Sequence, residues 1–420
     1  MQVKYLKSDS WFFFLGIVFT FALVSVLPAQ AEPRIKLGIE VLATAHPELV
    51  RDKKIALLVG PSSFDQNLEH TIDRLANAAQ IEVIFTGDRY FRTTLPPVGS
   101  NSRKLDALTN APVVELLDPL KRPRKKDLGQ AEIIVIDVQD LGIRYFPYVT
   151  LLAQFLELGR ETKLPVIVLD RPSPANASTV SGPILEVTKR SRFGVYPIPL
   201  VYGMTIGELA LYFNKAFGIG VPLTVVGMEG YSRTLSYRET GLHWAPPTEH
   251  LPEPETPAYY AITGFLGEMG LFSTGVGTTR PFHYILAPWI DGELLAHKLS
   301  AKELPGVRFL PVRVQPYYGL FQHKRTPGVE IVIDSPLDYD PVLAGVTILQ
   351  LLWESTPQRI PLANPSVAEG IDTLLGSDKV RLGLLKGISA KDLARQWRED
   401  LQKYQRERKA FLIYPDSSAP

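Results

Sequence analysis

The chain has 420 residues, 45% of them hydrophobic, so it can bury a large core and is long enough for two domains. Its 45 lysines and arginines almost balance 44 aspartates and glutamates, and the net charge of +1 argues against nucleic acid or an anionic membrane as a partner. The chain has no cysteine, which excludes disulfides, thiolate metal sites and a cysteine nucleophile. We therefore expect a small or uncharged partner.

The first 31 residues have the pattern of a signal peptide. Lys4 and Lys7 precede an apolar run over residues 11–27, and Ala29 and Ala31 then form a small-x-small cleavage site. The pattern predicts cleavage after Ala31 and an exported protein, periplasmic or extracellular. The alternative is an uncleaved N-terminal membrane anchor, because the apolar run approaches the roughly 20 residues that span a bilayer.

Residues 32–215 alternate between strand-like and helix-like patterns. Apolar runs at 54–59, 81–85, 132–136 and 165–169 predict strands, and helices are expected near 68–79, 148–161 and 205–217. This alternation predicts parallel βαβ units, hence a Rossmann-like α/β domain with a parallel sheet. Thr205 and Glu208 have the spacing of a capping box at the start of the third helix.

Polar residues follow each of the four predicted strands. Because the carboxyl ends of parallel strands share one edge of the sheet, where ligands bind, these side chains are expected to converge on one crevice. The charged residues of this group are Asp88, Arg89, Arg92, Asp137, Asp140, Arg144, Asp170 and Arg171. Aspartate after a strand also caps helices, so Asp137 or Asp140 could equally fix a loop, with Arg144 holding one of the two.

The second half, residues 216–415, has a different sequence pattern, which predicts a smaller α+β domain. A Pro-rich aromatic stretch at 244–260 and a Gly/Thr loop at 270–281 precede a strand pair at 307–314 and 328–334. Two or three helices are expected to follow and to end near residue 407, with residues 416–420 as a tail. A cleft between the two domains is a common place for a ligand.

Several kinds of chemistry are disfavoured by the motifs that the chain lacks. No Gly-x-Ser-x-Gly elbow, no glycine-rich dinucleotide turn and no nucleotide-binding Gly-Lys-Ser/Thr loop is present, and the seven histidines are scattered. We therefore predict no nucleotide cofactor and no metal. The carboxylates, arginines and aromatic residues that remain are the groups that hydrolysis of a glycosidic bond requires.

Several segments together resemble the exo-β-N-acetylmuramidases of bacterial peptidoglycan recycling, a family long described as a domain of unknown function. The similar segments are 136–148 (IDVQDLGIRYFPY), 169–174 (LDRPSP), 203–209 (GMTIGEL), 277–282 (GTTRPF) and 287–291 (APWID). The resemblance runs from about Gly38 to Tyr414. It implies a Rossmann-like N-terminal domain, an active site between the domains and release of terminal N-acetylmuramic acid.

The chain departs from the family pattern at polar positions. The proposed catalytic glutamate of the family corresponds to Asp88, one methylene shorter, and the adjacent histidine corresponds to Arg89. Other family residues, namely two glutamates, an arginine, an asparagine and a histidine, correspond to Thr274, His283, Val276, His250 and Tyr202. These departures suggest altered substrate choice or lost catalysis.

The resulting hypothesis is an exo-acting glycoside hydrolase that releases N-acetylmuramic acid, or a related amino sugar, from peptidoglycan fragments. The alternative is a catalytically inactive cell-envelope protein that binds sugar on the same scaffold. The predicted catalytic residues are Asp88 and Asp140, and Asp88 would need a second acid within roughly 5 to 10 Å, from Asp137, Asp140, Asp170 or Glu268. The predicted substrate-binding residues are Arg89, Arg92, Asp137, Gln139, Arg144, Tyr148, Asp170, Arg171, Glu208, Glu268, Thr278, Thr279 and Arg280.

Overall fold

The computed structural model describes residues 35–88, 91–92, 104–117, 121–175 and 177–416. The predicted signal peptide, Arg89 and most of the predicted tail lie outside these residues. Within the described ranges, no helix is both long enough and apolar enough to cross a membrane.

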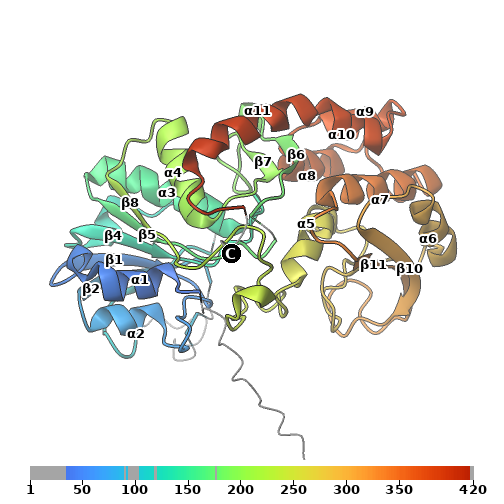
Figure 1. The fold of residues 1–420 in the computed structure, drawn as a ribbon. Coiled ribbons are helices and arrows are strands. Elements are labelled where there is room, and N and C mark those ends of the chain that lie inside the picture. Colours follow the sequence, from blue (N-terminus) through green and yellow to red (C-terminus); the bar gives the residue numbers. More distant parts are fainter. Residues whose placement is uncertain (1–34, 89–90, 93–103, 118–120, 176, 417–420) are drawn as a thin grey trace, which may run out of the picture. The chain divides into compact units, whose positions relative to one another are not determined.

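A parallel sheet of six strands forms the first half of the described chain (Figure 1). Its order is β3-β2-β1-β4-β5-β8, with β1 Lys54–Val59, β2 Gln80–Thr86, β3 Val113–Glu115, β4 Ile133–Asp137, β5 Val166–Leu169 and β8 Leu223–Val226. The helices of this half are α1 Gly38–Ala45, α2 Thr71–Ala76, α3 Pro147–Thr162 and α4 Ile206–Ala216. The four strands predicted for residues 32–215 and the strand pair predicted at 307–314 and 328–334 are present within one or two residues of their expected ends.

Alternate residues of the strands point to opposite faces of the sheet, and each face is covered by helices. Leu58 and Ile136 pack in the same core cluster as residues of α3 and α4. Leu57 and Val135 pack in a second cluster with residues of α1 and α2. Figure 1 shows the two helix pairs on opposite sides of the sheet. This two-sided burial explains why the strands are almost continuous apolar runs.

The second half contains a three-stranded antiparallel sheet of order β10-β11-β9, flanked by helices. Its elements are α5 Thr256–Gly267, β9 Tyr284–Leu286, α6 Gly292–Ser300, β10 Val307–Val314, β11 Thr326–Ile333, α7 Pro341–Ser355, α8 Pro365–Leu375, α9 Lys379–Leu385, α10 Ala390–Gln396 and α11 Arg398–Arg408. A two-stranded sheet, β6 Ser181–Ile184 with β7 Pro199–Val201, lies between α3 and α4 in the sequence.

The predicted fold class, a Rossmann-like parallel-sheet domain followed by a smaller α+β domain, is confirmed. Two details differ. Five helices, not two or three, follow β11 in the described chain, because this region is divided by short turns. The strand at 223–226 pairs in parallel with β5, so the first sheet continues beyond residue 215. The predicted domain boundary at residue 215 stays a prediction.

Candidate active site

A buried ion pair lies at the carboxyl edge of the sheet. Asp137, the last residue of β4, accepts hydrogen bonds from Nε and Nη2 of Arg171 at 2.5 and 2.9 Å. The hydroxyl of Thr71 donates a further bond to the same carboxylate. Asp137 is 0% exposed and Arg171 4% exposed. Asp137 and Arg171, both predicted to bind substrate, therefore use their hydrogen-bonding groups on each other at the edge of the sheet.

Asp170 follows β5 and binds other parts of the protein instead of facing a cavity. One carboxylate oxygen accepts from the hydroxyls of Thr205 at 2.7 Å and Tyr414 at 2.6 Å, and the other accepts from the Gly207 amide at 2.8 Å. Burial raises the pKa of Asp170 to about 7, although the hydrogen bonds from Tyr414 and Thr205 oppose the shift. Asp170 thus attaches the C-terminal segment to the sheet edge.

Glu208 is part of the same support. It caps its own helix by accepting from the Thr205 amide at 3.0 Å, while Thr205 Oγ1 accepts from the Glu208 amide at 3.3 Å, which confirms the predicted capping box. Its carboxylate also pairs with the buried guanidinium of Arg233 at 2.5 Å and accepts from the Ile413 amide at 2.9 Å. The prediction that Glu208 contacts substrate therefore has no support from its surroundings.

Asp140, predicted to be catalytic, is buried in its own loop. Its carboxylate accepts from the Gly142 amide at 2.7 Å and from the hydroxyl of Tyr202. Burial raises the pKa of Asp140 to about 6. The neighbouring Gln139 donates to the carbonyl oxygens of Asp140 at 2.9 Å and Pro172 at 2.7 Å. Both side chains stabilise the loop after β4, and neither lines the pocket described below.

Arg144 does not hold either aspartate, so that prediction is wrong. Its guanidinium donates to the carbonyl oxygens of Pro183 at 3.0 Å, Ile198 at 2.9 Å and Leu374 at 3.0 Å. The side chain is 0% exposed, and burial lowers its pKa to about 9. Arg144 connects the loop after β4 to the β6–β7 pair and to α8.

Four further residues predicted to bind substrate also lie outside the pocket lining. Arg92 forms two hydrogen bonds with Asp73, at 2.6 and 3.0 Å, and an ion pair with Asp106. In the Gly/Thr loop, the Thr278 hydroxyl donates to the Gly275 carbonyl at 2.7 Å, and the exposed Arg280 pairs with Glu330. Thr279, between them, is exposed. The loop is thus held by a contact within itself and by an ion pair with β11.

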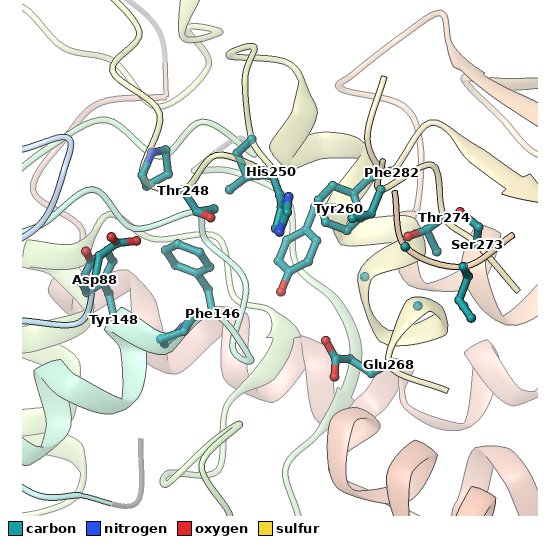
Figure 2. Close-up of a pocket in the computed structure, with 18 of the residues that line it drawn as sticks. Asp88, Phe146, Tyr148, Thr248, His250, Tyr260, Glu268, Ser273, Thr274 and Phe282 are labelled. Carbon is teal, nitrogen blue, oxygen red and sulfur yellow. The ribbon is translucent and has the colours of Figure 1, made fainter. Parts of the chain in front are cut away.

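A pocket of about 510 Å³ gathers the remaining predicted residues that the structure describes, and its volume is that of a typical small-molecule site. Asp88, Tyr148 and Glu268 line it, and Figure 2 shows Asp88 beside Tyr148 with Glu268 elsewhere on the wall. The lining includes residues from both halves of the chain. Other described side chains of the lining are Phe146, Pro147, Pro247, Thr248, His250, Leu251, Tyr260, Phe272, Ser273, Thr274, Val276, Phe282 and Leu320.

Asp88 is positioned by the end of β2. The Thr86 hydroxyl oxygen accepts from the Asp88 amide at 3.1 Å and donates to the Asp88 carbonyl at 3.0 Å, which fixes the backbone just after the strand. Tyr148 lies alongside, and both burial and the Asp88 charge raise the pKa of the Tyr148 hydroxyl. A Cβ at Gly60 would lie only 2.1 Å from that hydroxyl oxygen, so the glycine after β1 leaves the space for Tyr148.

Glu268 directly follows α5 as its C-cap residue and supplies a second carboxylate to the pocket. It lies near the hydroxyl of Tyr260, whose pKa is raised by burial and by the Glu268 charge (Figure 2). The ring of Tyr260 packs edge-on against Phe282, with centroids 4.7 Å apart, and against Tyr145 at 5.1 Å. These contacts hold Tyr260 and Phe282 in place. Together with Phe146 and Tyr148 they form the aromatic wall of the pocket that contains Asp88 and Glu268.

The aromatic wall was largely missed in the sequence. Of its members only Tyr148 was predicted as a site residue, whereas Phe146, Tyr260 and Phe282 also line the pocket. Phe146 precedes Tyr148 by two residues, and Tyr260 ends the aromatic stretch at 244–260, so both lie in segments that the sequence marked. Among the described lining residues there is no lysine or arginine.

Four of the departures from the family motifs lie in this lining: Asp88, His250, Thr274 and Val276. Two others do not. His283 stacks on Tyr259, with ring centroids 3.6 Å apart, and burial lowers its pKa to about 4. Tyr202 is buried against Asp140. In the part of the chain that the structure describes, no three histidine, aspartate or glutamate side chains are grouped to hold a metal ion.

Comparisons with known proteins extend over nearly the whole described chain. Two family models match, "Exo-beta-N-acetylmuramidase NamZ, N-terminal" over residues 55–255 and "Exo-beta-N-acetylmuramidase NamZ, C-terminal" over residues 258–414. The chain is 30% identical over 385 residues to the peptidoglycan beta-N-acetylmuramidase NamZ of Bacillus subtilis (strain 168), covering 91% of this chain and 92% of that protein. The resemblance inferred from the motifs is thereby confirmed.

Two solved structures have the same fold. A DUF1343 family protein of Bacteroides fragilis NCTC 9343 superposes with a TM-score of 0.84 at 29% identity, covering 91% of this chain and 99% of its own. A second DUF1343 family protein of the same organism has a TM-score of 0.70 at 22% identity, with the same coverage, and bears on the fold alone.

Proposed function

The chain belongs to the exo-beta-N-acetylmuramidase NamZ family, and on that premise we propose that it releases terminal N-acetylmuramic acid, or a related amino sugar, from peptidoglycan fragments. Membership of this family makes it a glycoside hydrolase. One observation carries the proposed site: Asp88, which corresponds to the family's proposed catalytic glutamate, lines a pocket with a second carboxylate and an aromatic wall.

The proposed reaction is hydrolysis of a glycosidic bond. The bond between the anomeric carbon and the leaving oxygen breaks, a water oxygen bonds to the anomeric carbon, and a proton passes to the leaving oxygen. Such chemistry uses two carboxyl groups. We assign them to Asp88 and Glu268, in place of the predicted Asp140, because Asp140 is buried in its loop. The aromatic wall offers apolar surface to the faces of a sugar ring.

The proposal includes export. The basic residues Lys4 and Lys7, the apolar run and the Ala29-x-Ala31 site favour cleavage after Ala31, which would place the protein where peptidoglycan fragments occur. N-terminal sequencing of the protein recovered outside the cytoplasm tests this step. Recovery of an intact Met1 in the membrane fraction would show an anchor instead.

The test of the activity uses two chromogenic glycosides, of N-acetylmuramic acid and of N-acetylglucosamine. We expect the purified exported protein to hydrolyse the first, and Asp88→Asn and Glu268→Gln each to lower kcat by about 100-fold or more, since acid–base groups contribute roughly that much. Glu293→Gln, a carboxylate change on α6 outside the pocket lining, is the matched control and should leave kcat unchanged.

Measurements of sugar binding distinguish an enzyme from the alternative, a catalytically inactive sugar-binding protein. If Asp88→Asn binds the sugar within a few-fold of the native protein but turns over nothing, the carboxylate acts mainly in the transition state. If the native protein itself binds the sugar by calorimetry and hydrolyses neither glycoside, the proposal fails, and a sugar-binding protein on a hydrolase scaffold is the better account.

A further inference from the structure

A second hollow lies beside the pocket and shares part of its wall. Its volume is about 530 Å³, and Gly87, Asp88 and Thr248 line both spaces. The other described residues that line it are Pro61, Leu117, Pro246 and Glu249. Asp88 therefore lies where the two spaces meet.

The fold explains why a hollow forms here. Pro61 follows β1, Gly87 and Asp88 follow β2, and Leu117 lies two residues beyond β3. These are the carboxyl ends of three neighbouring parallel strands, at the edge where sheets of this kind bind ligands. Segment 246–249 supplies the remaining side chains.

We propose that this second hollow is the leaving-group subsite, which holds the sugar that follows the terminal one in the glycan. The inference rests on the proposed function. In a glycoside hydrolase a catalytic carboxyl group lies at the bond that breaks, so the two sugars joined by that bond lie on either side of it. With the terminal sugar in the first pocket and Asp88 at the junction, the next ring lies in the second hollow.

The lining suits a neutral sugar ring. Pro61, Leu117 and Pro246 offer apolar surface to the C–H face of the ring, and the Thr248 hydroxyl and Glu249 carboxylate can bond to its hydroxyl groups. Hydrogen bonds to an ionised carboxylate are roughly twice as strong as neutral ones. The lining includes two carboxylates, Asp88 and Glu249, which disfavour an anionic group, so an uncharged N-acetylglucosamine ring fits better.

Comparison of two substrates tests the subsite. One is the chromogenic glycoside of N-acetylmuramic acid, whose leaving group is a small phenol, and the other is the disaccharide in which the same sugar is β-linked to N-acetylglucosamine. Glu249→Ala should lower kcat/KM for the disaccharide about 10-fold and change kcat/KM for the chromogenic glycoside less than 2-fold, and Glu249→Gln should recover part of the loss. Glu253→Ala, a nearby exposed carboxylate outside the hollow, is the matched control and should change neither.

The substrate pair also guards against an indirect effect. Glu249 lies 3.8 Å from His250, which lines the first pocket. A change transmitted through His250 would lower kcat/KM for both substrates equally, and that result would overturn the proposal. Equal values for the Glu249→Ala and native proteins on the disaccharide would overturn it as well.

A loop on the other flank of the first pocket gives the competing location. Gly319 and Leu320 line that pocket, and next to them Tyr317 is 64% and Tyr318 48% exposed. If Tyr317→Ala lowers kcat/KM for the disaccharide selectively while Glu249→Ala does not, the glycan leaves over this loop and the proposal is wrong.

Calorimetry separates failure of the subsite from failure of the proposed function. If the native protein hydrolyses neither substrate, the proposed function fails, and the subsite is then judged by affinity alone. We expect the disaccharide to bind more tightly than the monosaccharide, with the difference lost in Glu249→Ala. Equal affinities for the two sugars in the native protein would overturn the subsite.

Discussion

Replacing Arg171 with methionine tests whether the charged residues at the sheet edge support the fold or bind substrate. The sequence predicted a substrate contact, whereas the structure pairs Arg171 with Asp137 through two hydrogen bonds. Methionine fills much of the same volume and removes the charge. The carboxylate of Asp137 then remains buried with the Thr71 hydroxyl as its partner.

The size of the effect follows from this burial. Removing one member of a buried pair leaves an uncompensated charge, which costs about 3 to 5 kcal/mol. Because folded proteins have roughly 5 to 15 kcal/mol of stability in total, the variant should unfold at clearly lower denaturant. Asp137→Asn combined with Arg171→Met should be less destabilised than the sum of the single changes, because the double variant leaves no unpaired charge.

Urea unfolding followed by circular dichroism measures these differences. Arg308→Met is the matched control, because its pair with Asp334 is on the surface, with Arg308 74% exposed, and should contribute little to stability. A change below about 1 kcal/mol for Arg171→Met, together with a raised KM for substrate, would refute the structural reading and restore the predicted substrate contact.

Three other changes test the remaining network. Between about pH 4 and pH 7 the folded protein keeps the Asp170 proton that the unfolded chain releases. The free energy of unfolding should therefore fall as the pH rises across this range, by at most about 4 kcal/mol. The difference in the free energy of unfolding between pH 5 and pH 8 should be smaller in Asp170→Asn than in the native protein. Arg144→Met should lower the melting temperature, because three buried carbonyls lose their donor, while kcat of the folded enzyme stays the same; a selective loss of kcat would contradict this. Gly60→Ala should lower kcat/KM about 10-fold by displacing Tyr148, whereas Gly370→Ala, which has open space around it, should not, and equal rates for the two would show that the ring position is unimportant.

The fold was predictable because the apolar runs that indicate its strands are local features of the sequence. A parallel sheet buried on both faces requires nearly continuous apolar strands, and β1 and β4 have them, with every residue but Lys54 buried. One strand of the first sheet that the sequence did not predict, β3, has only three residues and lies at the end of the sheet, where only one neighbour constrains it. A run of three residues carries too little periodicity to predict a strand.

The candidate site was less predictable because the direction in which a side chain points depends on partners that are distant in the sequence. The sequence placed Asp137, Arg171 and Asp170 correctly at the carboxyl edge of the sheet, but not where their side chains point. Opposite charges at an apolar edge pair with each other, and Arg171 is 34 residues from its partner. Asp170 bonds to Tyr414, 244 residues away, which no strand or turn pattern reveals. Asp88 and Glu268 were named from the sequence, and both line the pocket.

The departures from the family motifs now have a structural interpretation. Asp88, His250, Thr274 and Val276 line the pocket, and none of them takes part in the buried pairs Asp137–Arg171 or Glu208–Arg233. Side chains in the pocket can change its chemistry without removing a partner from the supporting network, whereas a change in either pair leaves a buried charge. The TM-score of 0.84 with a relative shows a shared fold, and a shared fold does not by itself establish the chemistry at these four positions. We expect these four positions to influence which sugar the protein accepts, and substrate assays on variants of the pocket, rather than similarity of fold, test this expectation.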